Sequence, residues 1–210
     1  MPRPALIEDE ITALSERAGT AALELYEEGD LDAVSMRSVA RQLGLTGMAL
    51  YRYFPDGKSG LMAQMRVLVF RRFEKVLADP ISGRRSPKAN IVKIFQASAD
   101  FAVANPNLYR LMFSFTQDAD RETGSAVHAA RRACWKPLHS VFAQLKEEHG
   151  LTLDADELGH LFVAAAHGLI SFHLSGQPYP ERRLSQLDLL LELLFGGIVT
   201  DGLKHLPDKN

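Results

Sequence analysis

Hydroxyl, aromatic and cationic side chains are interleaved between positions 46 and 58, in the stretch TGMALYRYFPDGK. The guanidinium of Arg52 can pair bidentately with a guanine edge, a contact that contributes about 1–3 kcal/mol of discrimination between bases. Threonine, tyrosine and lysine side chains donate hydrogen bonds to phosphate oxygens, which position a protein on a duplex without specifying the sequence. These residue types can contact nucleic acid if the fold presents them on one surface.

Two short helices separated by a tight turn must present these side chains outward. Ser35 is a favourable N-cap, and apolar residues then recur at helical spacing as far as Leu43. Gly44 suits the left-handed position that ends a helix, and Thr46 can cap the next helix. Helices joined by so few residues cross steeply, which is the geometry of a helix-turn-helix. In that geometry the second helix can enter a DNA major groove.

The charge balance reverses where this motif begins. Residues 1–34 hold two basic and nine acidic side chains, a net charge of −7, whereas residues 35–75 hold eight basic and two acidic ones, a net charge of +6. The whole chain has a formal charge of only −2, so its bulk charge does not indicate nucleic acid. A charge run alone is usually a solvated face. Beside the turn pattern it supports a DNA-binding surface, because phosphate contacts dominate affinity for DNA.

The composition limits the other possibilities. A chain of 210 residues allows one large domain or two small ones, and a hydrophobic fraction of 46% is enough for a core. The single cysteine, Cys134, excludes an intramolecular disulfide and favours a reducing compartment. No apolar run approaches the roughly 20 residues of a membrane span, and the N-terminus lacks the apolar core of a signal peptide. We therefore expect a cytoplasmic protein with no membrane partner.

Helical periodicity accounts for nearly all of the chain, and we find no convincing alternating strand. The sequence predicts an all-α fold of about nine helices, with an N-terminal three-helix module over residues 1–58 and a C-terminal bundle over residues 59–210. A helix over 59–77 connects the two, and the turn-rich segment 79–87 follows it. Besides the two short helices after Ser35 and Thr46, the expected helices cover about 7–28, 59–77, 87–104, 106–115, 121–149, 154–175 and 184–203.

This pattern resembles the TetR family of transcriptional regulators. The resemblance is carried by ALELYEEGDLDAVSMRSVARQLGLTGMALYRYF (residues 22–54) followed by a lysine, and further on by NPNLYRLMF (105–113) and AAHGLISFHLSG (165–176). The second half is similar to a C-terminal type that often carries Trp-His-Gly, where this chain has Ala166-His167-Gly168. Two features depart from the family pattern: the turn before Lys58 is one residue longer, and the first helix begins with acidic residues. Both predict fewer backbone contacts, weaker binding or a different approach to DNA.

The resemblance implies that the second short helix reads DNA. It places Gly47, Met48 and Arg52 toward base edges, and Met48 and Ala49 could touch a thymine methyl group. The side chains expected to contact phosphate are Thr46, Tyr51, Tyr53 and Lys58, and Arg37 could reach either bases or phosphates. Packing against the first helix is the alternative role for the two tyrosines. Leu50 and Phe54 are core residues by their spacing, and we assign them no contact with DNA.

The resemblance also implies a pocket for a small, largely apolar ligand among the C-terminal helices. Ligand sites are commonly apolar with few polar groups, and Trp135 and His167 each bring polar atoms to an apolar face. Each candidate could equally be ordinary bundle core, so the set as a whole carries this prediction. The candidate ligand-binding residues are Phe101, Tyr109, Met112, Phe113, Trp135, Phe162, Ala166 and His167.

We expect no cofactor and no metal. His160 and His167 are seven residues apart and share a helix face, but zinc sites usually need three or four ligands at close spacing, and no cysteine or carboxylate cluster accompanies them. Cys134 is interpreted as a small core residue. The sequence shows no pairing of a nucleophile with a base and no phosphate-binding glycine loop. We therefore do not expect an enzyme.

The last two expected helices predict a homodimer. Leucines cover more than one face of the final helix, and such a helix can bury them all by packing on a partner subunit. A two-fold dimer reads a palindromic site. The predicted function is a ligand-responsive regulator, a repressor, that binds a double-stranded operator as a homodimer and is released by its small-molecule ligand. The alternatives are a ligand-binding helical protein with weak or lost DNA affinity, and a helical-bundle enzyme.

Overall fold

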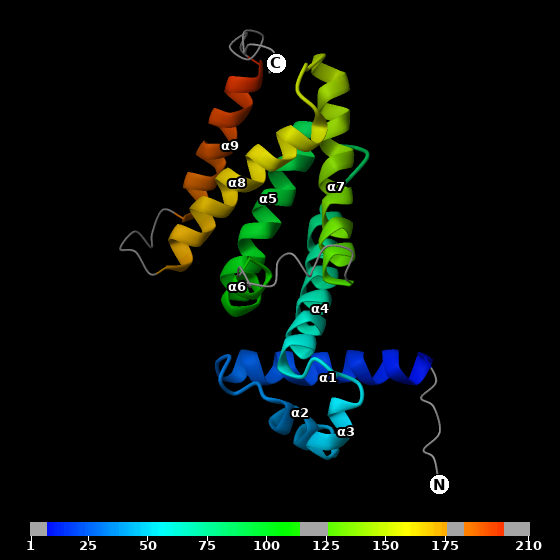
Figure 1. Cartoon of the computed structure of the whole chain (residues 1–210). Coiled ribbons are helices and arrows are strands. Elements are labelled where there is room, and N and C mark those ends of the chain that lie inside the picture. The colour runs from blue at the N-terminus through cyan, green and yellow to red at the C-terminus, as the bar shows by residue number, and fades with distance from the viewer. Residues whose placement is uncertain (1–7, 114–125, 176–182, 200–210) are drawn as a thin grey trace, which may run out of the picture. The chain divides into compact units, whose positions relative to one another are not determined.

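A computed structural model describes residues 8–113, 126–175 and 183–199. These residues form nine α-helices and no strand, which confirms the expected all-α fold (Figure 1). The helices are α1 (Glu8–Glu28), α2 (Met36–Gln42), α3 (Gly47–Tyr51), α4 (Lys58–Ala78), α5 (Pro87–Ala104), α6 (Pro106–Phe113), α7 (Ala126–His149), α8 (Ala155–Leu174) and α9 (Arg183–Val199).

The helix boundaries follow the cap and turn residues of the sequence. Helix α5 begins at Pro87 after the N-cap Ser86, whose Oγ accepts the N–H of Ala89 at 3.3 Å. Helix α4 begins at Lys58, one residue before its expected start. The expected helix ends at Ile7, Phe115, Arg121 and Leu203, and the expected turn at 176–180, lie outside the described residues.

The described helices form two compact units. The first contains residues 8–72, 107–113 and 126–132, and the second contains 73–106, 133–175 and 183–199. Helices α4 and α7 each contribute residues to both units. This division follows contacts between helices, and the expected domain boundary between residues 58 and 59 stays a prediction.

In the first unit, α1 packs closely on α4. A β-carbon on Gly19 would lie 2.8 Å from both the Cγ of Gln64 and the Cδ1 of Leu68, so a larger residue there would have to displace these side chains. Helix α1 also contacts α2, and α2 contacts α3. The buried side chains of this unit include Ala18, Ala22, Val34, Val39, Leu50, Phe54, Leu61 and Met65. Helices α2 and α3 of the helix-turn-helix contribute to this core, which holds them in place.

The core of the second unit is an aromatic cluster around Phe162, which is 1% exposed. Its ring centroid lies 5.0 Å from that of Phe142, 5.1 Å from that of Phe195 and 6.1 Å from that of Phe95. Tilted aromatic rings attract one another at these separations. Because the four rings come from α5, α7, α8 and α9, the cluster joins four helices.

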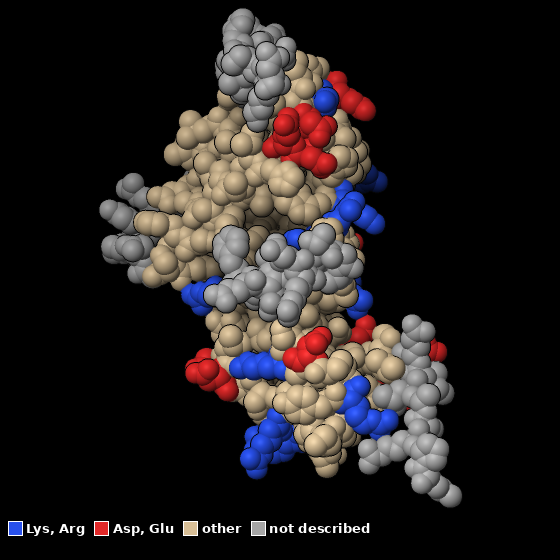
Figure 2. All heavy atoms as spheres, in the orientation of Figure 1, with Lys and Arg blue, Asp and Glu red and all other residues tan. Residues whose placement is uncertain are grey.

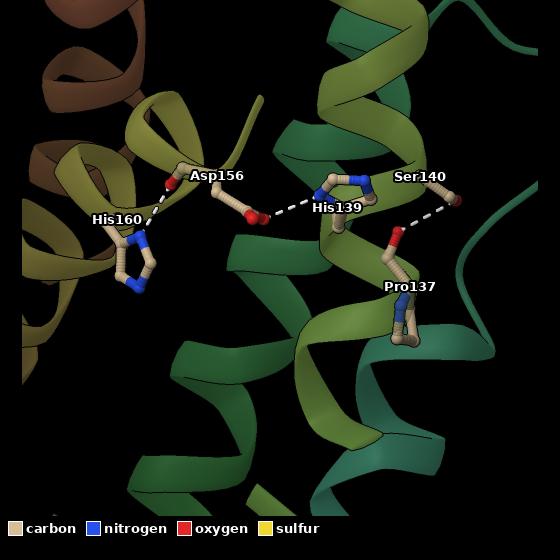
Figure 3. Close-up of polar contacts among 5 residues, drawn as sticks. All are labelled: Pro137, His139, Ser140, Asp156 and His160. Carbon is tan, nitrogen blue, oxygen red and sulfur yellow. Dashed lines mark hydrogen bonds and ion pairs between the residues drawn. The ribbon is translucent and has the colours of Figure 1, made fainter. Parts of the chain in front are cut away.

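A polar contact joins α7 to the first turn of α8 at the surface of the second unit (Figure 3). The Nδ1 of His139 lies 2.6 Å from the Oδ1 of Asp156, and the Asp156 carbonyl oxygen lies 2.7 Å from the Nδ1 of His160. The His160 ring in turn packs on Trp135, with 4.4 Å between ring centroids. These contacts hold the side of α8 that bears His160 against α7.

Candidate DNA-binding interface and ligand region

The N-terminus of α2 is closed by a reciprocal capping box. Ser35 Oγ accepts the N–H of Ser38 at 3.0 Å, and Ser38 Oγ accepts the N–H of Ser35 at 2.9 Å. Ser38 also donates its hydroxyl to the Ala33 carbonyl at 2.8 Å, which holds the preceding loop. The expected cap at Ser35 is confirmed. The contribution of Ser38 was not expected, because the third helical position of a capping box is usually Glu or Gln.

The turn between α2 and α3 has the expected left-handed residue and cap. Gly44 has a φ of 68°, and the next residue, Leu45, donates its N–H to the Ala40 carbonyl at 2.8 Å. Thr46 Oγ1 accepts the N–H of Ala49 at 3.1 Å and starts α3. A threonine hydroxyl also carries one hydrogen to donate, so capping leaves Thr46 able to bond an acceptor outside the helix.

Helix α3 and its C-cap residue Arg52 together present a mixed surface of apolar, aromatic and cationic side chains. Met48 is 77% exposed and Tyr51 is 49% exposed, whereas Leu50 and Phe54 are buried as the sequence predicted. The predicted DNA-binding residues that are exposed are Arg37, Thr46, Met48, Tyr51, Arg52 and Lys58, and those that are half-buried are Gly47, Ala49 and Tyr53. This surface stays a predicted interface.

The basic excess of residues 35–75 is partly neutralised within the first unit. Arg71 pairs with Glu16 of α1 at 2.7 Å, and Arg72 pairs with Glu27 at 3.7 Å. A third basic residue, Arg66, is only 5% exposed. The exposed basic side chains on α2, at the C-cap of α3 and at the start of α4 are Arg37, Arg41, Arg52 and Lys58. Figure 2 shows blue side chains on either side of uncharged surface at the end that carries α2 and α3 in Figure 1.

Lys58 makes a contact that the sequence did not indicate. Its Nζ donates a hydrogen bond to the Leu31 carbonyl at 3.1 Å, which links the start of α4 to the turn after α1. An ammonium group has three hydrogens, so the contact is compatible with a further bond to phosphate. Nothing in the sequence pointed to the Leu31 carbonyl, since it depends on two segments 27 residues apart.

The structure divides the eight candidate ligand-binding residues between the two units. Tyr109, Met112 and Phe113 lie on α6 in the first unit, where the rings of Tyr109 and Phe113 are 4.8 Å apart. The other five lie in the second unit, and they are Phe101, Trp135, Phe162, Ala166 and His167. Phe101, Phe162 and Ala166 are buried, while Trp135 and His167 are half-buried. The ring of Trp135 packs on that of His160, which is not among the eight candidates.

Burial shifts the pKa values of three titratable side chains, two of them among the candidate ligand-binding residues. It raises the pKa of Tyr109 well above its ordinary value and lowers that of His167. Burial also raises the pKa of the Cys134 thiol to about 12, with the nearby Glu74 charge adding to the shift. In each case burial disfavours the charged form of the side chain.

Two structural findings bear on other kinds of partner. Among the described residues, no group of three or more His, Cys, Asp or Glu side chains is arranged to hold a metal ion. None of the helices, over the part of the chain that the structure describes, has the length and apolarity to cross a bilayer.

Comparison with known proteins agrees with this architecture. The sequence of residues 91–195 matches a family model described as the tetracyclin repressor-like C-terminal domain, and residues 20–65 match a model described as bacterial regulatory proteins of the tetR family. The first of these matches covers half of the chain. No curated protein matches the sequence.

Solved structures share the fold at low sequence identity. A protein of unknown function from Rhodococcus sp. RHA1 is 18% identical, with a TM-score of 0.72 and coverage of 89% of this chain and 96% of that one. A TetR family regulator from Vibrio parahaemolyticus is 20% identical, with a TM-score of 0.64 and coverage of 85% and 96%. FadR from Thermus thermophilus, a TetR family repressor solved with lauroyl-CoA, is 16% identical, with a TM-score of 0.64 and coverage of 93% and 97%. The chain therefore belongs to the TetR family, and it is a DNA-binding transcriptional regulator and not an enzyme.

Proposed function

We propose that this regulator is a homodimeric repressor that binds a palindromic operator through α3 and is released by a small, largely apolar ligand. The observation that carries the proposal is the capped α2–α3 motif, from which Met48 and Arg52 are exposed to solvent. A helix held this way can present its side chains to a major groove.

We assign the interface residues two roles: some contact base edges and specify the DNA sequence, and others contact phosphates and position the protein on the duplex. Arg52 reads guanine, Met48 and Ala49 contact a thymine methyl group, and Gly47 lets the helix backbone come close to the bases. The positioning contacts to phosphate come from Arg37, Thr46, Tyr51, Tyr53 and Lys58. Exposure supports six of these assignments directly, while the half-buried Gly47, Ala49 and Tyr53 offer only part of their surface.

Two apolar stripes support a dimer formed by α8 and α9. On α8 the exposed Leu161, Gly168 and Phe172 are spaced by seven and four residues, which puts them on one helix face. On α9 the exposed Leu189 and Leu193 are four residues apart, while Leu187, Leu191 and Phe195 are buried on the opposite side. Large apolar side chains exposed along two adjacent helices mark an interaction surface. A second copy of the chain provides the matching surface under two-fold symmetry.

The neutral and aromatic character of the candidate ligand residues supports an apolar ligand. Tyr109, Phe113 and Trp135 offer rings with one polar atom or none, and His167 is held toward its neutral form. A protein of the same fold, FadR from Thermus thermophilus, was solved with lauroyl-CoA, which carries a long acyl chain. We infer that the ligand of this regulator also has a large apolar part, and we do not assign it as lauroyl-CoA.

Helix α4 is the element through which the ligand acts on DNA binding. It runs without interruption from Lys58 to Ala78 and contributes residues to both compact units. A ligand that binds one arrangement of the second unit more tightly shifts the population toward that arrangement. The size of the shift is set by the difference between the ligand's affinities for the two states. By linkage, operator binding weakens the ligand by the same factor.

The first test is selection of bound duplexes from a random DNA library at moderate salt, with Arg52→Ala and Arg72→Ala beside the parent. Arg72 is a matched control, because it is an exposed arginine that pairs with Glu27 of α1 and lies outside the proposed interface. We expect the parent and Arg72→Ala to enrich the same palindrome and Arg52→Ala to relax it at one position of each half-site. Absence of any enriched duplex, with the protein folded, would favour a ligand-binding protein that has lost DNA affinity.

The second test uses the intrinsic fluorescence of Trp135, the one tryptophan of the chain. Fatty acids and acyl-CoA esters of increasing chain length are titrated against the protein alone and against its complex with the selected operator. A ligand of the proposed kind changes the fluorescence and releases the operator in a mobility-shift assay over the same concentration range. Operator affinity indifferent to every compound that binds would refute the release mechanism.

A further inference from the structure

We propose that Gly57 is a positioning residue for DNA binding. In the proposal, Gly57 allows the Tyr51 ring to pack on the turn before α4, which fixes the Tyr51 hydroxyl and the C-terminal end of α3 against the DNA backbone. The inference rests on the proposed phosphate contact of Tyr51 and goes beyond it by naming the residue that holds this side chain in place.

The turn that contains Gly57 is closed by backbone hydrogen bonds. The Gly57 N–H donates to the Phe54 carbonyl at 2.9 Å, and the Gly57 carbonyl accepts the N–H of Leu61 at 3.1 Å, which is the first bond of α4. Its φ is +60°, in the left-handed region that favours glycine. Gly57 thus ends the turn and starts α4 in a conformation that a side chain would strain.

The Tyr51 ring occupies the space that a side chain at position 57 would need. A β-carbon on Gly57 would lie 3.1 Å from Tyr51 Cε1 and 3.9 Å from the Tyr51 hydroxyl oxygen. A separation of 3.1 Å is shorter than ordinary van der Waals contact, so the ring would have to move. Gly57 is buried although Tyr51 is 49% exposed, which means that the ring has one side on the turn and much of its surface in solvent.

Two other glycines separate the effect of the ring from that of the backbone. Gly44 and Gly150 also have positive φ values, 68° and 60°, but a β-carbon on either would meet no atom within 4 Å. All three positions share the left-handed strain, and Gly57 alone among them touches an exposed tyrosine. Gly150 has the same φ as Gly57 and lies in the second unit, so it is the better control.

This contact gives the turn before Lys58 a role. In the segment between Phe54 and Lys58, the backbone of Gly57 supports the aromatic ring at the end of α3. A tyrosine needed only for packing would not require half of its surface in water. A ring held on one side and exposed on the other keeps its hydroxyl in a fixed place for an acceptor outside the protein.

The test measures the Kd for the selected operator by fluorescence anisotropy. The variants are Tyr51→Phe, Tyr51→Ala, Gly57→Ala, the double variant Tyr51→Ala/Gly57→Ala, and Gly150→Ala as control. We expect Tyr51→Phe and Gly57→Ala each to weaken binding about tenfold, the size of one lost hydrogen bond to a charged group. In the Tyr51→Ala background, Gly57→Ala should cause no further loss, and Gly150→Ala should lower the Tm without changing the Kd.

Three outcomes would overturn the inference, and they are distinguishable from failure of the proposed function. Parent-like affinity of Gly57→Ala, or an equal loss of affinity in both Tyr51 backgrounds, would show that Gly57 does not act through Tyr51. If Gly57→Ala is too unstable for binding measurements, the Tm decides: the loss should shrink in the Tyr51→Ala background to that of Gly150→Ala, and an unchanged loss would overturn the contact. A parent protein that binds no duplex would overturn the proposed function itself.

Discussion

The exposed stripe of α9 gives a quantitative prediction for dimerisation. Leu189 is 60% exposed and Leu193 is 66% exposed in the single chain, on the side of α9 opposite to the buried Leu187 and Leu191. The double variant Leu189→Ser/Leu193→Ser removes this apolar surface and leaves the inward side of α9 unchanged. Because the change is confined to exposed positions, we expect the fold of the subunit to survive it.

The size of the effect follows from the exposed fractions. Full burial of a leucine side chain contributes roughly 2 kcal/mol. Because Leu189 and Leu193 are about two thirds exposed in the single chain, each gains about two thirds of this free energy when a partner covers it. By two-fold symmetry a dimer buries four such side chains, so the double variant should weaken the dimer by about 5 kcal/mol. That is a rise of three to four orders of magnitude in the dimer Kd.

The assay is sedimentation velocity over a concentration series from nanomolar to tens of micromolar, with circular dichroism to verify folding. Val103→Ser is the matched control, because Val103 of α5 is 50% exposed and lies on neither α8 nor α9. We expect the parent and the control to sediment as dimers and the double variant as a monomer at low micromolar concentration. An unchanged dimer Kd in the double variant would refute the assignment of this stripe to the interface.

Three further predictions concern stability and reactivity. Ser35→Ala should lower the free energy of unfolding by about 1 kcal/mol, measured by urea denaturation, because it removes the acceptor that caps α2. The Cys134 thiol, with a pKa of about 12, should react with iodoacetamide at pH 8 far more slowly in the folded protein than in urea, and equal rates would contradict its burial. Burial lowers the pKa of His167, so the unfolded chain binds the proton more tightly, and stability should fall as the pH drops through the unfolded value of about 6.5. His167→Gln should flatten that part of the profile of Tm against pH.

The elements that sequence reasoning placed well are those determined by neighbouring residues. Ser35 and Thr46 mark helix starts by hydrogen bonds over three positions, Gly44 marks a helix end by its φ value, and each has the expected role. The buried position of Leu50 follows from helical spacing in the same way. The family match then confirmed the DNA-binding transcriptional regulator that these local signals indicated.

The charges of the DNA-binding unit could not be assigned from the sequence. Counting gave eight basic residues over 35–75, but the pairing of Arg71 with Glu16 joins positions 55 residues apart, and it depends on how α1 packs against α4. The contact of Lys58 with the Leu31 carbonyl depends on packing too. A charge count registers the number of cations, whereas burial and ion pairs determine which of them reach the surface.

The helices, their caps and the helix-turn-helix could be predicted from the sequence, because they depend on residues a few positions apart. The folded structure is needed to see that Tyr51 packs on Gly57, that Trp135 packs on His160, and that Leu193 is exposed while Leu191 is buried. Periodicity shows that a side chain is apolar and which helix face carries it. Which neighbour that face meets is set by the turns between helices and by the packing of one helix on another, and the sites proposed here arise from that arrangement.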